Sequence, residues 1–239
     1  MDRSLKSASA RTELQMARSM CWHCQSEVSG EYFCDRCVKV QPLSKEQDYF
    51  TCLELPRLLT IDTSELENKF YEMSRSFHPD FYQTKTDTER GISLENSALL
   101  NAAYRTLKDP ILRAEYLVQL EAGAVKEIRN QPPADLFDQI LALQDDLEEF
   151  RAAGAHPSSD LTALRTKLQA DRETLEQRQR DMESRLFGLF EAWDRLQCQS
   201  EPTDTTRTKK EAVLKEMREL LSNRTYVRNI VNDLVATVG

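Results

Sequence analysis

Two amphipathic helical patterns, separated by the tripeptide His78-Pro79-Asp80, constrain the fold of this chain more than any other feature. Large apolar residues at helical spacing form the two patterns: Leu66, Phe70, Met73 and Phe77 before the tripeptide, and Leu99, Leu100, Ala103 and Leu107 after it. Proline lacks an N–H and disfavours helical angles in the preceding residue, so the first helix must stop at His78. A solvent-facing loop from Phe81 to about Glu89 then leads into the second helix. The pattern predicts a helical hairpin with the tripeptide at its exposed tip, within reach of another protein.

This hairpin resembles that of the J-domain family, which carries His-Pro-Asp at its tip. The resemblance covers roughly residues 48–123, and residues 48–55 read as the short first helix of that domain. The run Asp62-Thr-Ser-Glu65 reads as a helix cap, and Asp109-Pro110 begins the last helix. A lone His-Pro-Asp usually marks only the end of a helix, but two flanking apolar faces and a capped helix favour the functional interpretation.

Four cysteines form two knuckles near the N-terminus, Cys21-Trp-His-Cys24 and Cys34-Asp-Arg-Cys37. Two such pairs can present four thiolates to one ion, and zinc is the default metal for four sulfur ligands in a closed structural site. The alternatives are a disulfide pair, an iron site, or His23 in place of one cysteine. Gly30 lies between the knuckles, where a tight turn would help.

The zinc-binding module predicted at residues 21–42 is too short to bury a core of its own. Metal binding would therefore supply its folding energy, and chelation should unfold it locally.

The composition narrows the classes of partner. The chain has 239 residues, a net charge of −8, 30% charged residues and no apolar run long enough to span a bilayer, so we expect no membrane role. Its pI is about 5.1 and its knuckles carry no basic surface, so we expect no nucleic acid. Cys52 and Cys198 lie outside the knuckles. Cys52 sits among apolar residues and is predicted to be a buried thiol.

The first twenty residues carry scattered Arg and Lys with Ser and Ala. They are interpreted either as a disordered tail or as the remnant of a transit peptide.

A third unit is predicted at residues 134–236, after the breaker Asn130-Gln-Pro-Pro133. Its first helix is acidic and begins near Leu136. Its second carries an apolar residue at every seventh position: Leu161, Leu168, Leu175, Met182, Leu189 and Leu196. A final amphipathic helix runs from about Val213 to Leu234. Short connections favour an antiparallel three-helix bundle, and homodimerisation through the heptads is the alternative.

The order of these units resembles the mitochondrial iron-sulfur cluster co-chaperone family of the HscB type, in its animal form. The motifs that carry the resemblance are Cys21-Trp22-x-Cys24, Phe33-Cys34-x-x-Cys37, His78-Pro79-Asp80-Phe81 and the stretch from Leu107 to Leu117 that reads Leu-x-x-Pro-x-x-Arg-x-x-Tyr-Leu. An ordinary J-protein would carry a Gly/Phe-rich stretch after the J-domain, and this chain has none there. The expected fold class is mainly α: knuckle module, J-domain hairpin and C-terminal bundle.

The resemblance implies a non-enzymatic adaptor with two partners in the mitochondrial matrix, and leaves a cytosolic pool open. The J-domain would bind a mitochondrial 70-kDa heat-shock chaperone and stimulate its ATPase, through His78, Pro79, Asp80, Lys69 and Arg75. The bundle would bind the iron-sulfur cluster scaffold protein, through Phe137, Leu141, Asp145, Glu149 and Leu220. The metal site of Cys21, Cys24, Cys34 and Cys37 would hold one structural Zn²⁺. The alternatives are a general J-type chaperone and a zinc-stapled helical adaptor without a cluster role.

Overall fold

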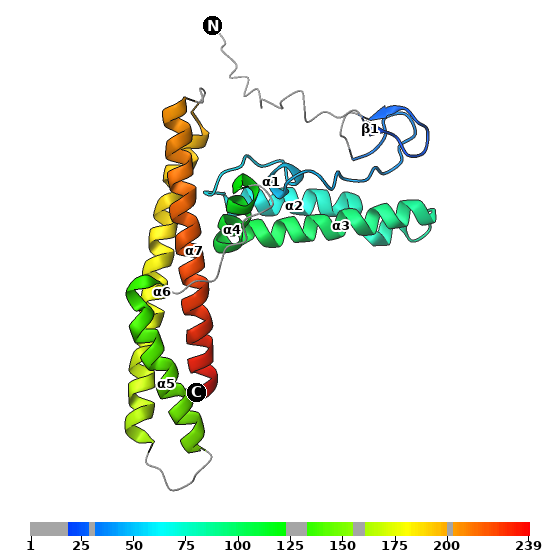
Figure 1. The fold of residues 1–239 in the computed structure, drawn as a ribbon. Coiled ribbons are helices and arrows are strands. Elements are labelled where there is room, and N and C mark those ends of the chain that lie inside the picture. The colour runs from blue at the N-terminus through cyan, green and yellow to red at the C-terminus, as the bar shows by residue number, and fades with distance from the viewer. Residues whose placement is uncertain (1–18, 29–31, 123–132, 155–160, 200–202) are drawn as a thin grey trace. The chain divides into compact units, whose positions relative to one another are not determined.

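The computed structural model describes residues 19–28, 32–122, 133–154, 161–199 and 203–239 (Figure 1). They divide into two compact units: residues up to Leu55 together with Thr63–Arg105, and Pro56–Asp62 together with Thr106–Gly239. Helices dominate both units, as the sequence predicted. The predicted tail falls almost wholly outside the described residues, as does Gly30. Across the described part of the chain, no helix combines the length and apolarity that crossing a bilayer requires.

The first unit begins with the cysteine knuckles. Strands β1 (Ser19–Met20) and β2 (Glu27–Val28) pair antiparallel, with Ser19 opposite Val28. Helix α1 (Tyr49–Cys52) follows, and its N-cap Asp48 accepts a hydrogen bond from the Thr51 N–H at 3.0 Å. Cys52 is buried as predicted, and burial raises the pKa of its thiol to about 11.

The predicted hairpin is formed by α2 (Thr63–Phe77) and α3 (Asp87–Lys108). Helix α2 ends at Phe77, one residue before His78, as Pro79 requires. The predicted loop is shorter than expected and is partly ordered. A 3₁₀ helix, η2 (Pro79–Tyr82), occupies its first half, and α3 already begins at Asp87, so Glu89 lies in a helix and is buried.

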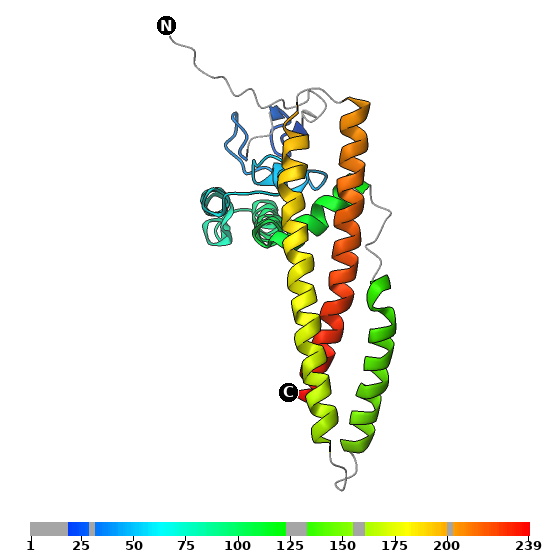
Figure 2. The same cartoon turned by 90° about the vertical axis from the view of Figure 1, so that its left-hand side faces the viewer.

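The first whole helix of the second unit is α4 (Pro110–Ala122), where Asp109 Oδ1 accepts from the N–H groups of Ile111 and Leu112 at 2.8 and 3.0 Å. After the short η3 (Ala134–Leu136) come α5 (Phe137–Gly154), α6 (Thr162–Gln197) and α7 (Asp204–Val238). Helices α6 and α7 pack along their lengths, and α5 lies beside only one half of this pair (Figure 2). Ion pairs join α5 to both: Asp146 to Lys167 and Arg151 to Asp233. The bundle therefore has three helices over about half of its length.

The heptad repeat of α6 follows the core only in part. Leu168, Leu175, Met182 and Leu196 are buried as the repeat predicts. Leu189 is only half-buried, and Leu161 precedes the helix. A straight α-helix turns once every 3.6 residues, so a seven-residue repeat drifts around it. The buried positions shift accordingly, and the core between Met182 and Leu196 is formed by Leu186, Phe190 and Trp193.

Candidate functional sites: the cysteine knuckles, the tripeptide loop and the α5 face

The four knuckle cysteines converge on one point. All four Sγ atoms lie within 4.8 Å of one another. The distance is 3.6 Å between Cys21 and Cys37, and also between Cys24 and Cys34. Four Zn–S bonds of about 2.3 Å in a tetrahedron would place the sulfurs about 3.8 Å apart, so the geometry fits a tetrathiolate metal site. A disulfide would need about 2.05 Å, and all six cysteines are free.

Each knuckle is a tight turn closed by one backbone hydrogen bond. The Gln25 N–H donates to the Cys21 carbonyl at 3.0 Å, and the Val38 N–H donates to the Cys34 carbonyl at 2.7 Å. Both donors have left-handed backbone angles, with φ of 58° and 56°. This turn brings the two sulfurs of each pair to the same side. His23 is exposed and lies outside the sulfur cluster, which does not favour it as a ligand.

The thiols of this cluster are in unequal environments. The Ser26 hydroxyl, 3.3 Å from the Cys34 sulfur, lowers the pKa of that thiol to about 6. Burial raises the pKa of Cys37 to about 12. Without a cation, the burial of the Cys37 thiol opposes the gathering of four negative charges at this point. A bound divalent ion would remove this conflict, because it stabilises every thiolate that coordinates it.

The tripeptide lies on an exposed, internally bonded loop. His78 caps η2, and its Nδ1 accepts from the Asp80 N–H at 3.4 Å. The Asp80 carboxylate accepts in turn from Gln83 Nε2 at 3.2 Å. Tyr82 is buried beneath the loop, and its hydroxyl donates to the Ser76 carbonyl at 2.8 Å. The His78 and Asp80 side chains are 55% and 69% exposed, so a partner can reach both.

The two basic residues predicted to assist the tripeptide lie on α2 and differ in environment. Arg75 is exposed near the end of the helix. Lys69 is half-buried, and its Nζ donates to the Glu54 carbonyl at 3.0 Å. A partner that binds Lys69 would have to compete with this contact.

A buried polar stripe on α3 was missed by the sequence reasoning. Glu89, Ser93 and Asn96 are all at least 96% buried, and they continue the face of Leu100 and Leu107 at the spacing i, i+4, i+7, i+11 and i+18. The stripe contacts the knuckle module. Asn96 Nδ2 donates to the Gln41 carbonyl at 2.9 Å, and its Oδ1 accepts from the Leu43 N–H at 2.9 Å. Extending the apolar face of α3 backwards along the sequence would have located it.

The predicted scaffold-binding residues divide into four exposed and one buried. Phe137 and Leu141 are 54% and 52% exposed, one turn apart on α5, with Asp145 and Glu149 exposed further along the same helix. The opposite face carries the buried Ile140, Leu143 and Leu147. Leu220 is only 6% exposed, so the expectation that it offers a surface contact is wrong. Leu220 is a core residue, because the apolar stripe of α7 faces its neighbours in the unit.

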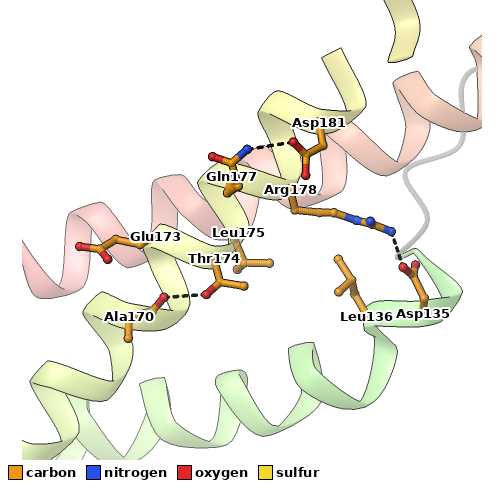
Figure 3. Close-up of a pocket in the computed structure, with 9 residues that line it drawn as sticks. All are labelled: Asp135, Leu136, Ala170, Glu173, Thr174, Leu175, Gln177, Arg178 and Asp181. Atoms are coloured by element: carbon orange, nitrogen blue, oxygen red, sulfur yellow. Dashed lines mark hydrogen bonds and ion pairs between the residues drawn. The ribbon is translucent and has the colours of Figure 1, made fainter. Parts of the chain in front are cut away.

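An open groove of about 630 Å³ lies between η3 and the middle of α6 (Figure 3). Its polar side chains interact with one another: Arg178 pairs with Asp135, and Gln177 donates to Asp181 at 2.9 Å. Leu136 and Leu175 supply its apolar part. The groove lies at a junction of helices, and these two contacts occupy four of its polar side chains.

Comparison with known proteins points to one family. No protein-family model matches the chain. The iron-sulfur cluster co-chaperone protein HscB of Mus musculus is 28% identical over 147 residues, which cover 59% of this chain and 63% of the relative. The co-chaperone protein HscB homologue of Vibrio cholerae is 36% identical over 125 residues, which cover 52% of this chain and 72% of the relative.

The chain belongs to the HscB co-chaperone family. The Vibrio cholerae match decides this, because it combines 36% identity with coverage of 72% of that relative's length. The crystal structure of the human co-chaperone protein HscB has the same fold, with a TM-score of 0.63 at 20% identity over 91% of this chain and 98% of that one. The chain spans less than two thirds of the mouse HscB protein that it matches. The family predicted from the motifs is thus confirmed.

Proposed function

We propose that this protein is a J-type co-chaperone of iron-sulfur cluster assembly that presents a cluster scaffold protein to a 70-kDa heat-shock chaperone. The observation that carries the proposal is the exposed His78-Pro79-Asp80 loop at the tip of the α2–α3 hairpin, in a chain of the HscB family. The mouse relative is named an iron-sulfur cluster co-chaperone, which supports the cluster role. The protein acts by binding and carries out no bond chemistry of its own.

The chaperone contact is assigned to the tripeptide with Arg75 and Lys69 beside it. The loop is exposed, and its internal hydrogen bonds favour one arrangement of the histidine and the aspartate before a partner arrives. A preordered loop loses less conformational entropy on binding than a mobile one. The two cations suit an acidic surface on the chaperone and would raise the association rate.

The scaffold contact is assigned to the α5 face formed by Phe137, Leu141, Asp145 and Glu149. Two large apolar side chains one turn apart, followed by exposed carboxylates, form an apolar anchor with an acidic end. Apolar residues at the centre of an interface with charges at its rim are typical of protein–protein contacts.

The knuckle metal is assigned as one structural Zn²⁺ on Cys21, Cys24, Cys34 and Cys37. Four thiolate ligands suit zinc and leave no open position on the ion. We place the protein in the mitochondrial matrix, because its eukaryotic relatives include the mouse iron-sulfur cluster co-chaperone.

The test is the steady-state ATPase of the mitochondrial 70-kDa heat-shock chaperone, with this protein alone and with the scaffold. We expect stimulation that rises further with the scaffold and is abolished in His78→Gln. The matched control is Thr84→Ala, an exposed residue of the same loop, which should keep full stimulation. Normal stimulation by His78→Gln would remove the proposal. Stimulation without a scaffold effect would favour a general J-type chaperone, and no stimulation would leave a zinc-stapled adaptor.

The α5 face has its own test. Phe137→Ser with Leu141→Ser should weaken scaffold binding by 100-fold or more, roughly the loss of two interface anchors, while ATPase stimulation without scaffold is unchanged. Titration calorimetry with the scaffold measures the affinity. Phe187→Ser on α6, an aromatic that is also exposed, is the control and should bind normally. Unchanged affinity in the double variant would show that the scaffold binds elsewhere.

A further inference from the structure

The knuckle module contacts both ends of the tripeptide loop. At the start of the loop, the ring of Tyr32 packs edge-on against Phe77, the residue before His78, with centroids 5.4 Å apart at 82°. Tyr32 is itself held in place, because its hydroxyl donates to Glu54 Oε1 at 2.7 Å. The last turn of α2 therefore packs directly against a residue that lies between the two cysteine pairs.

At the other end of the loop, a single carboxylate serves two purposes. Glu89 Oε2 accepts from the Thr86 N–H at 3.2 Å and from its hydroxyl at 2.8 Å, which closes a capping box at the start of α3. Glu89 Oε1 lies 2.9 Å from Lys39 Nζ, two residues after the last knuckle cysteine. The Glu89 side chain is only 5% exposed and that of Lys39 is 29% exposed, so the ion pair is largely shielded from water on the Glu89 side.

Between these ends, a buried series of hydrogen bonds through Gln41 joins a knuckle sulfur to α3. Gln41 Nε2 donates to Cys21 Sγ at 3.4 Å, and the Gln41 carbonyl accepts from Asn96. On either side of Asn96, the hydroxyls of Ser93 and Ser97 donate to the carbonyl of Phe77 at 2.7 and 2.9 Å. The same face of α3 thus holds both the knuckle module and the end of α2.

We propose that the knuckle module is a brace for the tripeptide loop, and that bound metal controls the order of that loop through Tyr32, Lys39 and Gln41. These three are positioning residues, since none belongs to the tripeptide. The effect on chaperone activation rests on the proposed function, whereas the coupling between metal and loop does not.

The small core of the module explains why the metal should matter. The buried apolar cluster of the knuckles consists of Cys21, Val28 and Cys34, with Cys24 and Cys37 packed against it, so most of its members are ligands. Such a core is stable only when the ligands are bound. Without metal, the module would no longer fix Lys39 and Gln41. Glu89 and Asn96 would then be left as buried polar groups without these partners.

Coupling of this kind is reciprocal. If the metal orders the loop, then weakening the brace must weaken the binding of the metal by the same factor. Two ion pairs of equal length join residues 39–45 to α3 and allow a matched comparison. The first is the Lys39–Glu89 pair, whose side chains are 29% and 5% exposed, and the second is Lys45–Glu95, also at 2.9 Å but with side chains 78% and 61% exposed. Exposed pairs contribute little.

The experiment measures hydrogen exchange at residues 78–90 in the full chain, with Zn²⁺ bound and after chelation. We expect chelation to speed exchange there by roughly tenfold or more, the factor that one buried charged hydrogen bond is worth. Amides of α6 and α7 serve as the internal reference and should not change. If exchange at residues 78–90 stays the same while the knuckle amides exchange rapidly, or if the chain binds no Zn²⁺, the proposal is overturned.

Variants of the Lys39–Glu89 ion pair test whether this contact couples the loop to the metal. With Zn²⁺ bound, Lys39→Met should speed exchange at residues 78–90 and weaken Zn²⁺ affinity by a similar factor, measured by competition with a chromophoric chelator. Lys39→Arg should restore both, and Lys45→Met should change neither. Glu89→Gln is a second variant that keeps the capping box, because glutamine also serves at that position. An unchanged Zn²⁺ affinity in both Lys39→Met and Glu89→Gln overturns the brace.

The ATPase assay separates the two proposals. If Zn²⁺ and exchange are coupled but no variant stimulates the chaperone, the brace stands and the proposed function fails. If stimulation depends on His78 but not on Zn²⁺ or Lys39, the proposed function stands and the effect of the brace on chaperone activation is overturned, while hydrogen exchange decides the coupling itself.

Discussion

At the scale of single residues, the backbone of Val38 is the most unusual point in the part of the chain that the structure describes. It has φ of 56°, and a β-branched side chain is rarely found in that left-handed region. Its side chain is 75% exposed, so packing does not hold it there. The Val38 N–H closes the second knuckle turn, and the turn therefore imposes this conformation. Glycine would adopt it without the steric cost.

Replacing Val38 with glycine should therefore tighten metal binding. An L-residue in this region costs about 1–2 kcal/mol, and glycine loses about 0.5–1 kcal/mol of this gain through its greater freedom in the unfolded chain. Because metal binding and folding of the module are linked, we expect Zn²⁺ affinity to rise by roughly two- to fivefold. Chelator competition measures it. Val38→Ala keeps its Cβ and should gain less, so equal affinity in the two variants would contradict this account.

The four cysteines that the structure brings together could be predicted from the sequence, and the residues of the proposed brace could not. The spacing of the cysteine pairs is a local pattern that few other structures require. Glu89 and Asn96 lie in a run of mixed polar residues, and a buried polar side chain looks the same in a sequence as an exposed one. The left-handed angles of Gln25 and Val38, which close the knuckle turns, were not predicted from the sequence either.

At the scale of elements, α6 shows how far a repeat predicts a core. Its heptad leucines predict a long helix with one apolar seam, and the helix is there. The buried seam drifts, because a straight α-helix with 3.6 residues per turn does not keep a seven-residue repeat facing one neighbour. Leu168 is fully buried, whereas Leu189 at the same heptad position is half-buried. Helix ends were easier to predict, because Pro79 and Asp109-Pro110 mark them in the sequence.

This drift makes a quantitative prediction. Leu168→Ala should lower the free energy of unfolding by about 2–5 kcal/mol, because it leaves a cavity in the core. Leu189→Ala should cost no more than about 1.5 kcal/mol, because part of its side chain already faces water. Urea unfolding followed by the fluorescence of the buried Trp193 measures both, in a Trp22→Phe background. Equal losses would mean that the heptad seam holds along the whole helix.

At the scale of the whole molecule, the compact units do not follow the predicted domains. The sequence predicted a continuous J-domain at residues 48–123. In the structure, residues 56–62 and α4 group with the long helices, while the hairpin groups with the knuckles. The order of modules could be predicted because each has a local signature. This grouping could not be, because it depends on contacts such as Leu59 with Asp194, which lie 135 residues apart.

That long-range contact gives the last prediction. Asp194 on α6 accepts from the Leu59 N–H at 2.7 Å with one carboxylate oxygen and from the Thr60 N–H at 2.8 Å with the other. Asp194→Asn keeps only one acceptor and also removes a charge that favours the buried cation of Arg113. We expect a loss of about 1.5–3 kcal/mol, the usual worth of a hydrogen bond to a charged group.

Hydrogen exchange at Leu59 and Thr60 should accordingly speed up by roughly tenfold or more in Asp194→Asn. The control is Glu191→Gln, one turn earlier on α6. Its ion pair with Arg195 is exposed on both sides, so its loss should change stability by no more than about 0.5 kcal/mol. If Asp194→Asn exchanged like this control, residues 56–62 would be held by their apolar side chains, such as the buried Leu59, and the two hydrogen bonds would add no stability.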